Sequence, residues 1–320
     1  MADPRFFVRS SPIALKKLAQ LTGAQLAEGA NPEQLIEDVA ALDTATPSQL
    51  SFLDNPKYIE SFSHSRAGAC FVRAKYSSRA PKAMALLITE TPYAAYALAA
   101  QYFYPNQPAP GISPHAHIAP SATIGKNCHI APGVVIGEGC VIGDDCVIGA
   151  NSTLSHAMLG SRVIIHRGVH IGQDGFGFAP GARGILKVPQ LGRVIIGDDV
   201  EIGSGSCIDR GAGPDTIIGD GCKIDNLVQI GHNVVLGKMV VIAAGCGIAG
   251  STKIGDGCML GGQVGIAGHL TIGKGVKLAA KSGVMTDIPD GATFGGAPAV
   301  PIKDWHRQTA ALIKLTGKKE

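Results

Sequence analysis

Aromatic residues are scarce in this sequence. Phe, Tyr and Trp make up 5% of the 320 residues, and there is a single Trp, whereas Gly occurs 43 times. An ordinary compact domain obtains much of its buried area from aromatic side chains and uses far less Gly. The composition therefore argues against a conventional core and favours a repetitive architecture.

Long apolar runs and a strong net charge are missing as well. The sequence has no run of roughly 18 apolar residues, which a membrane-spanning helix would need, and its first residues lack the apolar segment of a signal peptide. The formal net charge is only +3, without a basic run interleaved with aromatic residues, which argues against nucleic acid as a partner. We therefore expect a cytoplasmic protein with no transmembrane segment.

An aliphatic residue recurs at every sixth position over most of the chain. A six-residue step fits neither an α-helix nor a heptad, but it fits a chain that forms a short strand and then turns a corner. Three such sides close a triangular coil of about 18 residues, and the aliphatic side chains point inward and stack on those of the next coil. The two longest arrays are Ile112, Ile118, Ile124, Ile130, Ile136, Ile142, Ile148 and Leu154, and Ile218, Ile224, Ile230, Leu236, Ile242, Ile248, Ile254, Leu260, Ile266, Ile272 and Leu278.

Most of the cysteines follow the same repeat. Six of the eight fall four residues after an aliphatic position, where the other repeats have small or β-branched residues: Cys128, Cys140, Cys146, Cys222, Cys246 and Cys258. The sequence has no CxxC pair and no Cys/His cluster with the spacing of a metal site. We therefore predict that these cysteines are small apolar core residues, not metal ligands or disulfide partners.

Two insertions interrupt the six-residue register and must leave the coils as loops. The longer one lies between Ile171 and Ile196, and the shorter one lies between Ile208 and Ile218. Insertions on one face of a solenoid commonly form its binding surface. Both insertions are therefore expected to lie near a functional site.

Residues 1–105 lack the repeat and are predicted to form a small α/β domain. SPIALKKLAQLTG predicts a helix that is capped by a serine before Pro12 and ended by Gly23. ACFVRA and MALLITE predict strands, and TPYAAYALAAQYFY predicts a second helix. The solenoid is expected over 106–290, and 291–320 are expected to form a C-terminal extension with a helix in PIKDWHRQTAALIKL.

Five sequence segments give the chain a family resemblance. They are FLDNPKY at 52–58, DGFGF at 174–178, IDRGA at 208–212, IGHNVVLG at 230–237 and GGAPAVP at 295–301. With the hexapeptide repeat, they resemble the left-handed parallel β-helix acyltransferases, and among these the UDP-3-O-acylglucosamine N-acyltransferases of lipid A biosynthesis. The resemblance extends over nearly the whole chain, and the left hand of the helix is implied by it alone, because most crossover connections are right-handed.

The resemblance implies a reaction and its partners. A 3-hydroxyacyl group would pass from its thioester on acyl carrier protein to the 2-amino group of a UDP-3-O-acyl-glucosamine, with no metal or other cofactor. The family is also homotrimeric, with active sites between neighbouring solenoids. Flat prism faces that pack around a threefold axis agree with this arrangement.

The resemblance also assigns roles to residues of the solenoid. His232 matches the general base, a role that suits an imidazole at neutral pH, although an outward His could also fill a trimer interface. Asp225 matches the acidic residue that orients this base, within the chain or across the trimer, unless it lies at a solvated corner. Gly250 matches the N–H donor to the oxyanion or is an ordinary corner glycine. His269, two coils beyond His232 on the same side of the prism, matches a substrate-binding residue.

In the small domain, Phe52, Asn55 and Tyr58 match the family's uridine site. There the aromatic rings would stack on the base and the Asn amide would pair with the uracil edge. The alternative is that both rings fill the core of a domain with few aromatic residues. The remaining binding residues lie in the DGFGF loop, which resembles the lining of the acyl or pantetheine groove: Asp174, Phe176 and Phe178.

Three other functions are compatible with parts of the sequence. The related UDP-N-acetylglucosamine O-acyltransferase shares the solenoid but lacks a uridine-binding domain like 1–105. A zinc-dependent β-helix carbonic anhydrase binds its metal with three histidines, and His166, His170, His232 and His269 are candidates, although the register is interrupted between the first and third. A structural scaffold would need the repeat but none of the family motifs.

Overall fold

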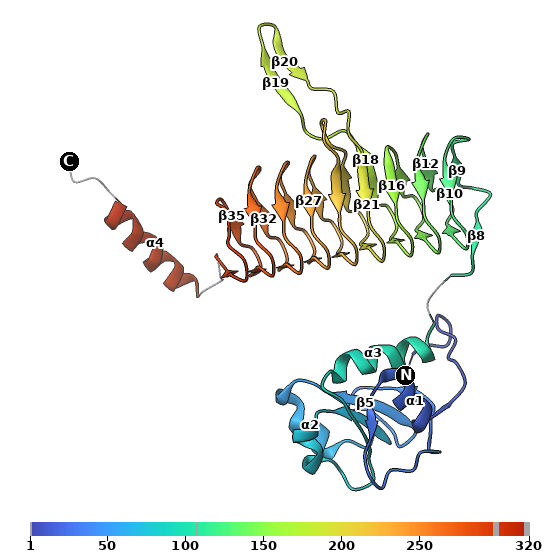
Figure 1. The fold of residues 1–320 in the computed structure, drawn as a ribbon. Helices are drawn as coiled ribbons and strands as arrows, with labels where there is room; N and C mark the ends of the chain where they lie inside the picture. The colour runs from blue at the N-terminus through green and yellow to red at the C-terminus, as the bar shows by residue number, and fades with distance from the viewer. Residues whose placement is uncertain (1, 106–107, 297–300, 317–320) are drawn as a thin grey trace. The chain divides into compact units, whose positions relative to one another are not determined.

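The computed structural model describes residues 2–105, 108–296 and 301–316 (Figure 1). By their internal contacts these residues divide into two units, Met1–Gln107 and Pro108–Glu320. The first unit has its own hydrophobic clusters, and the second is built around a single long one. Each unit is therefore described by itself.

The first unit is a small α/β domain built on a five-stranded sheet. In spatial order its strands are β2 (Gln25–Leu26), β7 (Ala85–Ile88), β6 (Ala69–Val72), β5 (Gln49–Leu53) and β4 (Asp38–Val39). Only β2 is antiparallel to its neighbour. The helical segments are α1 (Leu15–Thr22), η1 (Pro56–Tyr58), α2 (Ile59–His64), η2 (Ala74–Arg79) and α3 (Pro92–Phe103). The strands predicted in ACFVRA and MALLITE and the helix predicted in TPYAAYALAAQYFY are confirmed as β6, β7 and α3.

The predicted start of the first helix was wrong. Helix α1 begins after Ala14, which provides no side-chain cap. The two residues before the helix form β1 (Ile13–Ala14), which pairs with β3 (Leu35–Ile36), so this segment is extended and the serines further upstream cannot cap the helix. Gly23 ends α1 with a φ of 68°, as predicted for a residue that must enter the left-handed region.

The second unit is a solenoid with three parallel sheets, which we call sides 1, 2 and 3. Side 1 has β8 (Gly111–Ile112), β11 (His129–Ile130), β14 (Val147–Ile148), β17 (Ile164–Ile165), β22 (Glu201–Ile202), β25 (Lys223–Ile224), β28 (Val241–Ile242), β31 (Met259–Leu260), β34 (Lys277–Leu278) and β36 (Thr293–Phe294). Side 2 has β9 (His117–Ile118), β12 (Val135–Ile136), β15 (Thr153–Leu154), β18 (His170–Gln173), β23 (Cys207–Asp209), β26 (Gln229–Ile230), β29 (Gly247–Ile248), β32 (Gly265–Ile266) and β35 (Gly283–Val284). Side 3 has β10 (Thr123–Ile124), β13 (Val141–Ile142), β16 (Ala157–Leu159), β21 (Val194–Ile196), β24 (Thr216–Ile218), β27 (Val235–Leu236), β30 (Lys253–Ile254) and β33 (Thr271–Ile272).

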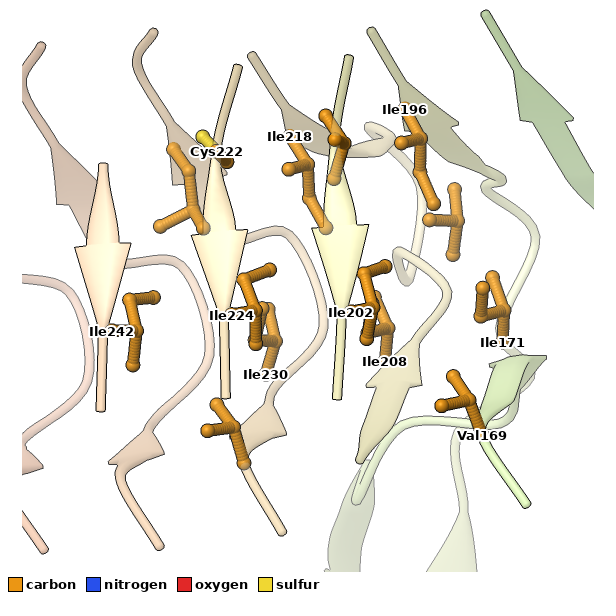
Figure 2. Close-up of a cluster of buried hydrophobic side chains, with 14 of the residues drawn as sticks. Val169, Ile171, Ile196, Ile202, Ile208, Ile218, Cys222, Ile224, Ile230 and Ile242 are labelled. Carbon is orange, nitrogen blue, oxygen red and sulfur yellow. The ribbon is translucent and has the colours of Figure 1, made fainter. Parts of the chain in front are cut away.

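The inward aliphatic residues stack on one another from coil to coil. Ile224 pairs with Ile242, and Ile230 pairs with Ile248, so equivalent residues in regular coils are 18 positions apart. Figure 2 shows inward side chains of this kind in rows inside the solenoid. The aliphatic residues of the six-residue series from Ile130 to Leu278 are almost fully buried. The six cysteines of the repeat are buried beside them, which confirms the apolar role predicted for them.

Both insertions leave the coils next to side 2. The longer one follows β18 and forms a hairpin of β19 (Phe178–Gly181) and β20 (Gly184–Lys187), which stands out from the stacked coils (Figure 1). The shorter one connects β23 to β24. Because β18, β23 and β26 are neighbours on side 2, the two insertions begin on adjacent coils.

The predicted C-terminal helix is confirmed as α4 (Ile302–Thr316). Residues 297–300, which belong to the GGAPAVP segment, lie outside the described residues. None of the helices in the three described ranges is long and apolar enough to span a membrane.

Candidate active site

A pocket of about 680 Å³ lies where side 2 meets the two insertions. Five of the residues singled out from the sequence line it: Asp174, Phe176, Phe178, His232 and Gly250. The first three come from the longer insertion, and the last two follow β26 and β29 on adjacent coils. The fold therefore brings together residues that are far apart in the sequence.

The imidazole of His232 lies between two glycines. A Cβ atom at Gly175 would be 2.6 Å from Cβ of His232, and one at Gly250 would be 2.7 Å from its Nε2. Distances this short leave no room for a side chain at either position. The half-buried imidazole is thus held closely on both sides and still reaches the pocket.

Gly250 presents a backbone donor beside this imidazole. Its N–H makes no hydrogen bond within the described residues, whereas its carbonyl accepts from the N–H of His269 at 3.1 Å. The exposed His269 lies two strands beyond His232 on side 2, as predicted from the spacing, and does not line the pocket. Nε2 of His232 and the free N–H of Gly250 are therefore neighbouring groups, one basic and one a donor.

Asn233 is the polar partner of this imidazole. Its Oδ1 lies 2.8 Å from Nδ1 of His232. The sequence reasoning did not single out this residue. Its position directly after His232 is the signal in the sequence that could have identified it, because Asn carries a strong acceptor and favours corners. In the structure it occupies such a corner, with a φ of 61°.

Asp209 is a buried carboxylate in the same pocket, and it was also missed. It accepts hydrogen bonds from Nε2 of Gln173 at 2.8 Å and from Nε2 of Gln229 at 3.0 Å. Burial raises the pKa of Asp209, and the two amide donors and the nearby His232 only partly oppose this effect. Asp209 follows an inward Ile at a position that most repeats fill with Gly or Ala, and this departure was the available signal.

Asp174 connects the two insertions. Its carboxylate forms ion pairs with Lys187 of the hairpin and with Arg210 of the shorter insertion, the latter at 2.6 Å. Hydrogen bonds from Lys187 and then Arg210 hold the pKa of Asp174 below its usual value. With both partners in place, this carboxylate stabilises the loop at the mouth of the pocket.

Phe176 and Phe178 pack edge to face with their ring centroids 5.0 Å apart and remain exposed.

The structure does not bring Asp225 to His232 within one chain. Asp225 follows β25 on side 1, so the whole of β26 on side 2 separates the two residues. Its Oδ1 accepts from the backbone and side-chain nitrogens of Asn226, and its Oδ2 accepts from the N–H of Ala244. Asp225 also lines a different pocket, of about 530 Å³, together with His166, Glu201 and Lys223.

The four histidines considered as zinc ligands have separate surroundings. On side 1, Nε2 of His166 is hydrogen-bonded to Oε1 of Glu201 at 2.9 Å. On side 2, Nδ1 of His170 is hydrogen-bonded to Oγ1 of Thr153 at 2.8 Å. In the ranges that the structure describes, no three His, Cys, Asp or Glu side chains are grouped closely enough to hold a metal ion.

A second pocket, of about 460 Å³, lies in the small domain. It is lined by Phe52 at the end of β5 and by Asn55 and Tyr58 around η1, so the fold places the three predicted uridine residues together. Tyr58 is 52% exposed, and Oδ1 of Asn55 caps η1 by accepting from the N–H of Lys57. The sequence reasoning missed Tyr93, which lines the same pocket and packs on Phe52 with ring centroids 5.2 Å apart.

This fold and site define a hexapeptide-repeat acyltransferase, with an imidazole and a free N–H at one corner of a left-handed parallel β-helix. Residues 109–138, 121–156 and 215–250 match the bacterial transferase hexapeptide repeat, and 193–226 and 251–284 match the hexapeptide repeat of succinyl-transferase. The UDP-N-acetylglucosamine acyltransferase of Campylobacter jejuni has a similar structure, with a TM-score of 0.53 and 22% identity over 66% of this chain and 86% of that one. The UDP-N-acetylglucosamine acyltransferase of Bacteroides fragilis is also similar, with a TM-score of 0.52 and 25% identity over 66% of this chain and 86% of that one. These likenesses agree with the predicted left-handed fold.

The chain belongs to the UDP-3-O-acylglucosamine N-acyltransferase family. Residues 33–102 of the small domain match the family model of UDP-3-O-(3-hydroxymyristoyl) glucosamine N-acyltransferase. Relatives named UDP-3-O-acylglucosamine N-acyltransferase are 51% identical in Parvibaculum lavamentivorans and 52% identical in Granulibacter bethesdensis, each over 98% of this chain and 97% of the relative. The Methylorubrum populi relative is 46% identical over the same shares.

Proposed function

We propose that this chain transfers a 3-hydroxyacyl group from acyl carrier protein to the 2-amino group of UDP-3-O-acyl-glucosamine, in the cytoplasmic synthesis of lipid A. The observation that carries the proposal is the imidazole of His232, which is held between Gly175 and Gly250 at the edge of an open pocket. The family membership supports the choice of reaction. The similarity over 98% of the chain, which includes the small domain, favours the N-acyltransferase over the O-acyltransferase, the carbonic anhydrase and a scaffold.

Acyl transfer to an amine requires a base, a donor to the oxyanion and binding of both substrates. Nε2 of His232 takes the proton of the 2-amino group as the nitrogen attacks the thioester carbonyl. The N–H of Gly250 donates to the oxygen that becomes negative. When the carbon–sulfur bond breaks, the protonated imidazole returns the proton to the leaving thiolate. The carboxylate of Asp209 lines the same pocket and can accept a hydrogen bond from the neutral 2-amino group.

The other predicted residues bind the substrates. Phe52 and Tyr58 stack on the uracil, and the amide of Asn55 pairs with its edge. Phe176 and Phe178 border the groove of the acyl or pantetheine chain, and Asp174 keeps their loop in place. His269 contacts the acceptor from the next coils along side 2, through a phosphate or an acyl oxygen.

A homotrimer would complete the site. Asp225 lies at a different corner of the solenoid from His232, so it orients the base only from a neighbouring copy. The hairpin β19–β20 supports such an assembly, because Ile185 and Leu186 are 78% and 59% exposed. Apolar residues at such exposure are typical of surfaces that a partner covers.

The substitution His232→Ala tests the proposal. We expect a loss of at least about 10²-fold in turnover with little change in folding, because a general base usually contributes about 10² to 10⁴-fold. The measurement is transfer of the 3-hydroxyacyl group from acyl carrier protein to UDP-3-O-acyl-glucosamine. His117→Ala is the matched control, since it removes an exposed imidazole on side 2 at the N-terminal end of the solenoid, far from His232 along the stack. Near-normal turnover in His232→Ala would refute the assignment of the base.

A further inference from the structure

The side chain of Asn233 contacts the imidazole that precedes it. Oδ1 of Asn233 lies 2.8 Å from Nδ1 of His232. Either nitrogen of a neutral imidazole can carry the proton, and the partner of Nδ1 decides which one does. The proton therefore lies on Nδ1 if the atom of Asn233 that faces it is an oxygen.

Two backbone groups of the shorter insertion orient the Asn233 amide. The N–H of Ala212 donates to Oδ1 at 3.2 Å, and Nδ2 donates to the carbonyl of Pro214 at 2.5 Å. A reversed amide would set a donor against the Ala212 N–H and an acceptor against the Pro214 carbonyl, so both hydrogen bonds would be lost. The atom that faces His232 is consequently the oxygen, which can only accept.

The main chain on both sides of the Asn233 side chain is also fixed by close contacts. The N–H of Asn233 donates to Oγ1 of the fully buried Thr216 at 2.9 Å. A Cβ atom at Gly211 would lie 2.8 Å from Nδ2 of Asn233 and 1.6 Å from the carbonyl oxygen of Pro214. The shorter insertion is therefore closed tightly around the Asn233 side chain.

We propose that Asn233 is a positioning residue of the acyl transfer, which keeps the proton of His232 on Nδ1 and leaves Nε2 free to accept the proton of the amine. The proposal rests on the role of His232 as the base. It gives the shorter insertion a specific task, because Ala212 and Pro214 orient the amide through their main-chain atoms. Since the amide is neutral, it holds the tautomer without placing a charge at Nδ1.

The first test compares two substitutions with a matched control. We expect Asn233→Ala to lower kcat by about 10 to 100-fold, as is usual when the partner of a functional His is lost, with the KM of each substrate nearly unchanged. Asn151→Ala is the control, because Asn151 is an exposed corner residue with the same φ of 61°, so it meets the same backbone strain. Asn233→Asp keeps an acceptor for Nδ1 but sets its second oxygen against the Pro214 carbonyl, so it should recover only part of the kcat that Asn233→Ala loses.

The second test observes the tautomer directly. In protein with ring-¹⁵N-labelled histidine, the His232 signals are identified by their loss in His232→Ala. We expect Nδ1 to be protonated and Nε2 unprotonated in the wild type, and the Nε2–H form to become populated in Asn233→Ala. An unchanged kcat in Asn233→Ala would overturn this proposal while leaving the base assignment intact. An Nε2–H tautomer in the wild type would overturn this proposal and also the role of Nε2 as the base, because a protonated Nε2 cannot accept the proton of the amine. Activity in His232→Ala would instead remove the base assignment, and this proposal with it.

Discussion

The position of His232 depends on residues with no side chain. Gly175 and Gly250 approach its imidazole from two segments, and a methyl group at either position would overlap it. The N–H of Gly250 makes no hydrogen bond within the described residues, so it is available to an incoming oxygen. At the scale of the residue, the site is therefore made by close backbone approach as much as by functional groups.

This packing predicts the effect of one added methyl group. Gly175→Ala should displace the imidazole and lower kcat by about 10²-fold, because a displacement near 1 Å of a reacting group can have this effect. Gly247→Ala is the matched control, since a Cβ atom there would have no neighbour within 4 Å. Steady-state kinetics of both variants is the measurement. Equal turnover in the two would show that the glycine contact does not position the base.

The small domain gives a second residue-scale prediction. Phe52→Ala or Tyr58→Ala should raise the KM for the UDP-sugar by about 10 to 100-fold, because a base stacked on an aromatic ring gains about 1 to 3 kcal/mol. Tyr58→Phe keeps the ring and should bind UDP nearly as the wild type does. Calorimetric titration with UDP checks both. Unchanged UDP affinity in the alanine variants would place the uridine site elsewhere.

Motifs in the sequence identified the residues around His232 but not all of their partners. His232 and His269 could be placed on one side of the prism because a coil has a fixed length. The sequence could mark Asn233 and Asp209 as unusual positions, but it could not give their hydrogen-bond partners, because these depend on how the insertions fold back onto the coils. The partners of an insertion are set by tertiary contacts such as the ion pair between Asp174 and Arg210, and these leave no periodic signal.

The turns between the strands of the solenoid share one backbone conformation, which repeats from coil to coil. Among the residues that the structure describes, thirteen other than Gly adopt φ values between 47° and 64°, and in the solenoid these values accompany the turns between strands. Leu227 and Met239 are among them and are exposed, although the left-handed region costs a residue with a Cβ atom about 1 to 2 kcal/mol. Stacking of the strands on both sides holds these corners.

Each strand presents one inward and one outward side chain, which predicts unequal effects of substitution. Ile242→Ala should lower the free energy of unfolding by about 2 to 5 kcal/mol, because it removes a fully buried side chain from the stack. Val241→Ala, one residue earlier on the 40% exposed outer face, should change it by less than about 1 kcal/mol. Denaturant unfolding measures both. Similar losses in the two variants would contradict the inward orientation.

Prediction from the sequence worked best for elements that repeat. The six-residue step determined the three sides, their stacking and the burial of the cysteines, because one geometry is imposed many times. Prediction was weaker for features that occur once. One example is α1, where the pairing of Ile13 with Ile36 displaced the expected start of the helix. Such a pairing depends on a distant segment, and a local cap signal cannot report it.

The reactivity of the cysteines tests whether the core is closed along the whole solenoid. Burial raises the pKa of Cys146 and of Cys222 to about 11, so at pH 8 they should react with a thiol reagent roughly 100-fold more slowly than an exposed thiol. The half-buried Cys207 should react first, and Cys207→Ser should abolish that phase. In denaturant all eight thiols should react. Rapid reaction of several thiols in the native protein would contradict a closed core.

The same thiols make stability depend on pH. Their pKa values are raised in the folded state, so they contribute stability below the unfolded value near 8.5, and this stability is lost as the pH rises toward about 11. The reason is that the unfolded chain releases these protons first.

The stacking of the coils also determines the order in which the solenoid would unfold under a pulling force. In the described part of the solenoid, the strands of each coil pair with strands of the coil before it and of the coil after it, so a force that pulls the chain ends apart can detach coils one at a time. Most detachments would free 18 residues, or roughly 60 Å of extended chain, as the pairing of Ile224 with Ile242 requires. The coil with the hairpin pairs Ile164 with Glu201, so it would release about twice that length in a single step. In the extension trace, this longer step would identify the coil whose insertion lines the candidate active site.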